Sequence, residues 1–229
     1  MKRIAILSDL HSNLEALQAV AKNLEVDDVI ALGDSVGYGA NPNEVLDWIK
    51  DRNCMIIRGN HEEATITGNT GWFNPMAARS ILWTRQMLTS ANLDFLSSLE
   101  EKKLIELDGI RIRLVHGSPN DPLFEYVYEE THRHLFEYYL QKEEADIIAL
   151  GHTHVPFLWR STKGIILNPG SVGQPRDGDK RASFAILTVE DGVPTVEHHR
   201  VGYSIDVAAN KIRSAGLPEM LAERLYYGR

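Results

Sequence analysis

Short apolar runs, rich in β-branched residues, recur along the chain and constrain its fold more than any other feature. They occupy residues 4–7, 29–32, 55–57, 112–115, 147–150, 165–167, 184–189 and 195–201. Their length and composition are typical of β-strands. Helical patterns separate the first three runs, and this alternation of strands and helices predicts a parallel α/β arrangement.

Helix and turn signals lie between these runs. Ser12 and Glu15 form a capping-box pattern before one helix, and Pro42 stands at the first position of the next. Asp-Gly pairs at 108–109 and 191–192 predict hairpin turns. Further helical patterns cover residues 77–88, 94–99, 129–141, 207–214 and 218–226.

The length and net charge of the chain limit the classes of protein to which it can belong. With 229 residues, the chain can bury a core without disulfides or a structural metal, and we expect one domain over 1–229 with helical insertions around 62–102 and 118–143. The net charge of −8 argues against a surface that coats nucleic acid. Cys54 is the only cysteine, and the first apolar run is too short to span a membrane. We therefore expect a cytoplasmic protein without a membrane partner, and a small phosphorylated substrate is compatible with this charge.

Polar side chains of catalytic or metal-binding type directly follow five of the predicted strands. Each alone is ordinary loop polarity, but ligands of open α/β sheets bind outside the carboxyl ends of the strands, where groups from separate strands can meet. We therefore expect these side chains to converge on one site. They are Asp9, His11, Asp34, Asn60, His61, His116, His152 and His154.

Seven of these residues are candidate metal ligands. The mixture of carboxylate, imidazole and amide groups suits manganese, our first expectation, or iron, nickel, cobalt or zinc, and the lack of a cysteine cluster disfavours a structural thiolate site. Seven donors exceed the need of one tetrahedral ion, and a carboxylate can bridge two ions, so we expect two divalent metal ions. The candidates are Asp9, His11, Asp34, Asn60, His116, His152 and His154.

The order of these motifs resembles that of the calcineurin-like metallophosphoesterase superfamily. The chain has D-x-H at 9–11, G-D at 33–34, G-N-H-E at 59–62, H-G at 116–117 and G-H-x-H at 151–154. The segment N-P-G-S-V-G at 168–173 is similar to one in small bacterial and archaeal phosphodiesterases of this superfamily. The resemblance implies an α/β fold, a four-layer α/β/β/α sandwich with a mixed two-sheet core.

The resemblance also implies a role for each site residue. Asp34 would bridge both metals, and His61 would face the phosphate. The segment 35–39 lacks the arginine that serine/threonine protein phosphatases of the superfamily carry there, which disfavours that activity. The first metal would be held by Asp9, His11 and His154, and the second by Asn60, His116 and His152.

These roles imply hydrolysis of a phosphoester by a metal-bridging hydroxide, with Asn60 and His61 in contact with the substrate. His61 would be the catalytic residue that donates a proton to the leaving oxygen or stabilises its charge, and a helix-capping role is the alternative. We expect a phosphodiesterase acting on a small phosphorylated compound. A phosphomonoesterase or dinucleoside-polyphosphate hydrolase could use the same ligands, and a non-catalytic interaction module is the alternative of another class.

Residues outside the motifs have two interpretations each. Arg176 either grips the phosphate bidentately, as a substrate-binding residue, or makes a surface salt bridge. Trp72, Phe73, Tyr126 and Tyr128 could stack on an aromatic group of the substrate, but we expect them to pack in buried positions.

The C-terminal segment carries one apolar helical face, made by Leu217, Leu221 and Leu225. Such a face can mediate self-association into a homo-oligomer. Packing of these leucines onto the chain's own domain is the simpler explanation.

Overall fold

The structure of the protein is a computed structural model that describes residues 1–229. Its strands are β1 Lys2–Leu7, β2 Asp28–Ala31, β3 Met55–Ile56, β4 Lys102–Leu107, β5 Ile110–Val115, β6 Ile147–Ala149, β7 Phe157–Ser161, β8 Gly164–Asn168, β9 Ala182–Glu190 and β10 Val193–Val201. Its helices are α1 Leu14–Ala21, α2 Pro42–Asp51, α3 Asn60–Thr67, α4 Pro75–Met87, α5 Ser90–Ser97, α6 Arg133–Glu143, α7 Ile205–Ser214, α8 Glu219–Glu223 and the 3-10 turn η1 Arg224–Tyr226.

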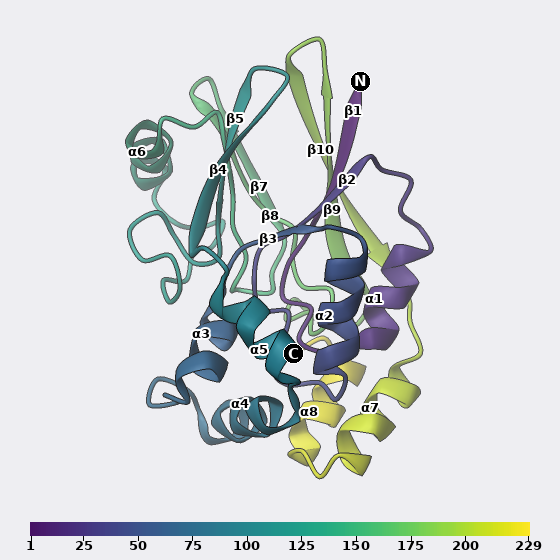
Figure 1. The fold of residues 1–229 in the computed structure, drawn as a ribbon. Helices are drawn as coiled ribbons and strands as arrows, with labels where there is room; N and C mark the ends of the chain where they lie inside the picture. The colour runs from purple at the N-terminus through teal and green to yellow at the C-terminus, as the bar shows by residue number, and fades with distance from the viewer.

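The strands form two mixed five-stranded sheets, as the resemblance implies (Figure 1). The first has the order β10-β9-β1-β2-β3, in which β1, β2 and β3 are parallel and β9 is antiparallel to both its neighbours. The second has the order β4-β5-β6-β8-β7, in which β5, β6 and β8 are parallel and the outer strands are antiparallel to their neighbours. Each sheet thus contributes three parallel strands whose carboxyl ends can carry a site.

Alternation along the strands places apolar side chains on both faces of the sheets. In β1, Ile4 and Ile6 pack against the second sheet, whereas Ala5 and Leu7 pack under α1 and α2. On the far side, α6 covers the second sheet through Phe136 and neighbouring residues. The order helix, sheet, sheet, helix is the expected four-layer sandwich (Figure 1).

One local expectation is wrong, and one strand was not predicted. Asn13, and not Ser12, caps α1, because its Oδ1 accepts a hydrogen bond from the Ala16 N–H at 3.1 Å. The Ser12 N–H is instead bound to the Ser35 carbonyl, which ties this residue to the loop after β2. Strand β7 was not expected from its sequence, because it is a half-exposed edge strand held in place by pairing with β8.

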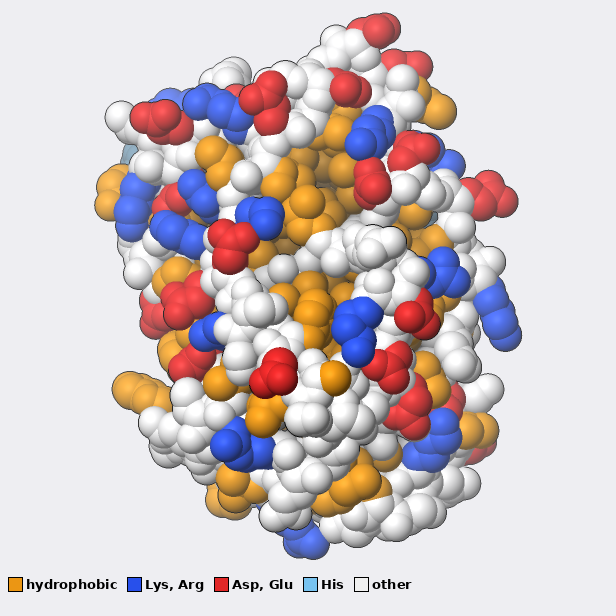
Figure 2. Space-filling view, viewed as in Figure 1, with side chains coloured by type: hydrophobic (Ala, Val, Ile, Leu, Met, Phe, Trp, Pro, Cys, Tyr) orange, Lys and Arg blue, Asp and Glu red, His pale blue; other side chains and the backbone are white.

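The expected hairpin turns and the expected start of the second helix are confirmed. Asp108-Gly109 and Asp191-Gly192 turn the hairpins β4–β5 and β9–β10 with positive φ at both central residues. Pro42 is the first residue of α2. Between the two hairpins, hydrophobic side chains show in a hollow where the inter-sheet core reaches the surface (Figure 2).

The remaining helices gather around the carboxyl ends of the strands. Helices α3 and α4, with α7 and α8, lie at the end of the sandwich opposite the N-terminus (Figure 1). Leu217, Leu221 and Leu225 are buried there in a cluster that includes Tyr38, so the packing of these leucines onto their own chain is confirmed. No helix combines the length and apolar character that crossing a bilayer requires.

Candidate metal centre and the cleft beside it

The eight site residues predicted from the strand ends lie together, and all are buried. Main-chain pairing of neighbouring strands brings their carboxyl ends, and the loops that follow, to the same edge of each sheet. The strands and the residues that follow them are β1 with Asp9 and His11, β2 with Asp34, β3 with Asn60 and His61, β5 with His116, and β6 with His152 and His154.

Asp9, His11 and His154 form the first donor cluster, with their ligand atoms within 4.8 Å of one another. The Nε2 atoms of His11 and His154 are 3.1 Å apart, and His154 Nε2 is 3.2 Å from Asp9 Oδ1. Although it is buried, Asp9 Oδ1 accepts no hydrogen bond. A buried carboxylate oxygen facing imidazole nitrogens in this way is satisfied by a bound cation.

Asp34, His116 and His152 form the second donor cluster, also within 4.8 Å. His116 Nε2 lies 3.3 Å from Asp34 Oδ2 and 3.1 Å from Asn60 Oδ1. Asp34 Oδ2 is in addition 3.7 Å from His11 Nε2 of the first cluster. The Asp34 carboxylate therefore lies between the two clusters, which is the place of a ligand shared by two ions.

One ring nitrogen of each histidine in the two clusters is held by a main-chain carbonyl. A nitrogen that donates its proton outward leaves the lone pair of the other nitrogen directed at the site, as metal binding requires. The donor set therefore fits two divalent ions. The pairs are His11 Nδ1 with Val36 O, His116 Nδ1 with Leu32 O, His154 Nδ1 with Gln174 O, and His152 Nε2 with Phe124 O.

The loops that carry these ligands have unusual backbone conformations. Left-handed φ is uncommon outside glycine and persists only where the surrounding structure imposes it, often at functional sites. Five of the seven candidate ligands have it: Asp9 at 52°, His11 at 47°, Asp34 at 52°, His152 at 68° and His154 at 61°.

Glu62 fixes the loop after β2 against the start of α3. Its carboxylate accepts main-chain N–H groups of Asp34 at 2.7 Å, Ser35 at 2.6 Å and Gly59 at 2.8 Å. Gly59 cannot carry a side chain there, since a Cβ would lie 2.2 Å from Asp34 Oδ1. The fourth motif residue of G-N-H-E thus positions Asp34 without belonging to either cluster.

Burial and neighbouring charges determine the protonation of the site histidines. Burial, followed by the charge of His116, lowers the pKa of His152 to about 3. Burial also lowers the pKa of His116, but the charge of the Asp34 carboxylate outweighs burial and raises this pKa to about 10. A cation entering the second cluster must therefore displace a proton that His116 holds against Asp34.

His61 lies beside both clusters and is buried. Its main-chain N–H donates to Asp34 Oδ1 at 2.9 Å, and its Nε2 is 4.0 Å from Asp34 Oδ2. The ring packs against Tyr38 and Phe73, at centroid distances of 4.5 and 5.1 Å. His61, His11 and Asp34 also make a third group of donor atoms within 4.8 Å, so geometry alone allows His61 to serve as a ligand.

A cleft of about 400 Å³ opens beside these residues, a size that suits a small molecule. Asp34, Asn60, His61, His152 and His154 lie on its floor. Its walls come from the loops and the C-terminal segment: Tyr38, Trp72, Phe73, Asn74, Asp121, Phe124, Tyr126, Arg176 and Arg224.

The expected burial of the aromatic residues is wrong for three of the four. Trp72 is 83% exposed, Tyr126 52% and Tyr128 43%. Tyr126 stacks on the His152 ring at a centroid distance of 4.0 Å, and Phe73 packs edge-on to His61. The segments that carry these residues border the site and do not fill a core. Aromatic character alone does not distinguish these two positions.

Arg176 and Arg224 are the two cations of the cleft. Arg176 has no carboxylate within salt-bridge distance, contrary to the surface-pair interpretation, and its Nη2 donates to Gln174 Oε1 at 3.0 Å and to Tyr38 Oη at 3.3 Å. Arg224 was not expected from the sequence, because it lies outside every motif, on the last turn of the chain.

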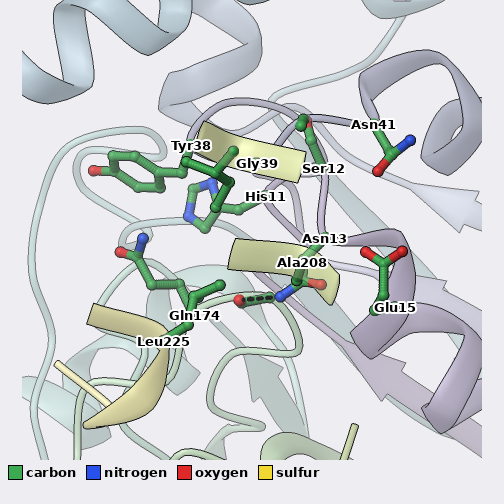
Figure 3. Close-up of a pocket in the computed structure, with 13 residues that line it drawn as sticks. His11, Ser12, Asn13, Glu15, Tyr38, Gly39, Asn41, Gln174, Ala208 and Leu225 are labelled. Atoms are coloured by element: carbon green, nitrogen blue, oxygen red, sulfur yellow. Dashed lines mark hydrogen bonds between the residues drawn. The ribbon is translucent and has the colours of Figure 1, made fainter. Parts of the chain in front are cut away.

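Behind His11, away from the cleft, is a cavity of about 10 Å³, room for about one water molecule. Figure 3 shows His11 beside Tyr38, with Gln174 and Leu225 below them. Asn13 Nδ2 donates to the Gly173 carbonyl at 2.8 Å across this region. The helices of the C-terminal segment therefore support the first cluster from behind.

Comparison with known proteins agrees with this geometry. The sequence pattern of the calcineurin-like phosphoesterase superfamily domain matches residues 1–192. An uncharacterized protein from Methanocaldococcus jannaschii is 39% identical over 99% of this chain and 98% of its own length. The probable metallophosphoesterase YsnB from Bacillus subtilis is 25% identical over 91% of this chain and 98% of its own.

Among solved structures, the crystal structure of a metallophosphoesterase from Sphaerobacter thermophilus has a TM-score of 0.86 and 37% sequence identity. It covers 100% of this chain and 99% of its own. The similarity thus extends over the whole fold, including the C-terminal segment that follows the matched family domain.

Proposed function

The chain belongs to the calcineurin-like phosphoesterase superfamily, and we propose that it is a phosphodiesterase that hydrolyses a small phosphorylated compound with the aid of two divalent metal ions. The observation that carries this proposal is the pair of buried donor clusters that meet at Asp34 on the floor of an open cleft. Manganese is the ion we expect, because mixed oxygen and imidazole ligands without thiolate suit it.

Bound in the two clusters, divalent ions supply an activated water and neutralise charge on the phosphoryl oxygens. The chain's own residues orient the substrate. Asn60, at the start of α3, presents its amide to the cleft, and Arg176, in the cleft wall, binds a phosphate oxygen of the substrate. Burial lowers the pKa of His61 to about 4, so near pH 7 its ring is neutral and stabilises the leaving oxygen through an N–H hydrogen bond.

The size of the cleft supports a diester over a monoester. Its volume of about 400 Å³ leaves room for a group on either side of the phosphorus, whereas a monoester fills only one side. A non-catalytic interaction module is disfavoured because every proposed ligand position is intact and the donors are buried and oriented.

A comparison of two chromogenic substrates tests this proposal. Metal-stripped protein is reloaded separately with manganese, nickel, zinc or magnesium and assayed with bis(p-nitrophenyl) phosphate and with p-nitrophenyl phosphate. We expect manganese to restore hydrolysis, with kcat/KM higher for the diester. A preference for the monoester would overturn the diester assignment, and no hydrolysis with any ion would favour the interaction module.

A further inference from the structure

Arg224 stands in the wall of the cleft although it comes from the far end of the chain. It shares this wall with Arg176 and Tyr38, which follow different strands. Arg224 is half-buried, and its Nε donates to the main-chain oxygen of Arg229 at 2.7 Å. Its two terminal nitrogens have no hydrogen-bond partner and remain available to a ligand.

The position of Arg224 is fixed by its neighbours. Leu225 is 3% exposed and packs in the cluster that contains Tyr38. The Gly178 N–H donates to the Gly228 carbonyl at 3.0 Å, which ties the C-terminal turn to the loop that begins at Arg176. The two arginines therefore lie on segments that are hydrogen-bonded to each other. Because these segments are already in place, little entropy is lost in ordering them when a ligand binds.

The two guanidinium groups line the same cleft, and neither pairs with an Asp or Glu side chain. Burial, followed by the charge of Arg176, lowers the pKa of Arg224. Of the carboxylates in the cleft, Asp34 belongs to the metal clusters, and Asp121 Oδ1 accepts the Phe124 N–H at 3.1 Å. Neither arginine has an Asp or Glu side chain within salt-bridge distance, and the oxygen of Arg229 contacts only Nε of Arg224, so the terminal nitrogens of Arg224 and the Arg176 guanidinium are left to a ligand.

We propose that Arg176 and Arg224 form a second phosphate subsite next to the metal centre, so that the cleft takes substrates in which a second phosphate is joined to the scissile one. Guanidinium groups bind phosphate oxygens in a planar, bidentate manner, and the mutual repulsion of the arginines is relieved when an anion lies between them. This inference rests on the proposed function, because the scissile phosphate is assigned to the metals.

Binding measurements test the subsite without requiring turnover. Calorimetry on manganese-loaded protein compares AMP with α,β-methylene-ADP, which adds a second, non-hydrolysable phosphate. We expect the wild type to bind the diphosphate roughly tenfold or more tightly than AMP, and Arg224→Ala to reduce this preference to about threefold or less. Arg224→Lys keeps the charge but loses the planar fork, and should give an intermediate preference.

Arg160→Ala is the matched control, because Arg160 is exposed on β7 and removing it changes the net charge equally. It should keep the wild-type preference. Circular dichroism shows whether each variant folds. If Arg224→Ala does not fold, the test is made with Arg224→Lys. A full diphosphate preference in the Arg224 variants, or an equal loss in Arg160→Ala, would overturn the subsite. Because no hydrolysis is involved, this outcome is separate from a failure of the phosphodiesterase assays.

Discussion

The floor of the cleft and its walls, called the rim below, differ in burial and in the segments that supply them. The floor consists of residues such as Asp34, His152 and His154, which are buried, follow strands of both sheets and have left-handed backbone. The rim consists of Trp72, between α3 and α4, and of residues such as Arg224 from the C-terminal turn. Trp72 is 83% exposed, whereas Asp34 is 1% exposed.

From this difference we infer that the floor determines the chemistry and the rim determines which substrates are preferred. A change in the floor leaves buried charges without partners, so its effect should be large and the same for every substrate. A change in the rim removes one contact to whatever part of the substrate reaches it, so its effect should be smaller and substrate-dependent. The following predictions test this separation, from the largest expected effect to the smallest.

Asp34→Asn should have the largest effect. It removes the charge that lies between the two donor clusters, so elemental analysis should find fewer than two ions per chain and turnover should fall on the order of 10⁴-fold. Asp121→Asn is the control, because Asp121 lies in the same cleft but outside both clusters. Two tightly bound ions in Asp34→Asn would contradict the bridging role.

His61→Ala should separate binding of metal from turnover. We expect both ions to be retained while kcat falls on the order of 10²- to 10⁴-fold for every substrate, because the N–H that faces the leaving oxygen is lost. His134→Ala, on the exposed face of α6, should leave both quantities unchanged. Loss of one ion in His61→Ala would show that the third donor group, with His11 and Asp34, holds metal instead.

The affinity for metal should rise with pH. The pKa of His116 is raised to about 10, so below that value a proton occupies the second cluster and must leave before an ion binds. Between about pH 6 and pH 9 the apparent affinity should therefore increase about tenfold per pH unit, and one proton should be released per bound pair of ions. Calorimetry in buffers of different ionisation enthalpy measures this release. An affinity independent of pH would remove His116 from the ligand set.

Trp72→Ala should have the smallest and most selective effect. Loss of one exposed aromatic contact should raise KM about two- to tenfold for a diester with aromatic groups and leave that for an aliphatic diester nearly constant. Tyr138→Ala removes an exposed ring outside the cleft and serves as the control. An equal rise in KM for both diesters would show that Trp72 affects the floor and does not contribute selectivity.

The same division explains how much the sequence could predict. Asp34, Asn60 and His152 come just after apolar runs, and parallel strands bring such positions together whatever the loops do, so the floor could be predicted. Trp72 could not be placed, because an aromatic residue in an inserted segment suits a core or a rim equally well. No sequence pattern indicates that Arg224 reaches the cleft, because only the packing of Leu225 beside Tyr38 brings it there.

Anomalous diffraction from manganese-loaded crystals tests the central claim most directly. We expect two peaks, both next to Asp34. One should be bound by Asp9, His11 and His154 and the other by Asn60, His116 and His152, with His61 bound to neither. A single peak among His11, Asp34 and His61, or none at the floor of the cleft, would contradict the account.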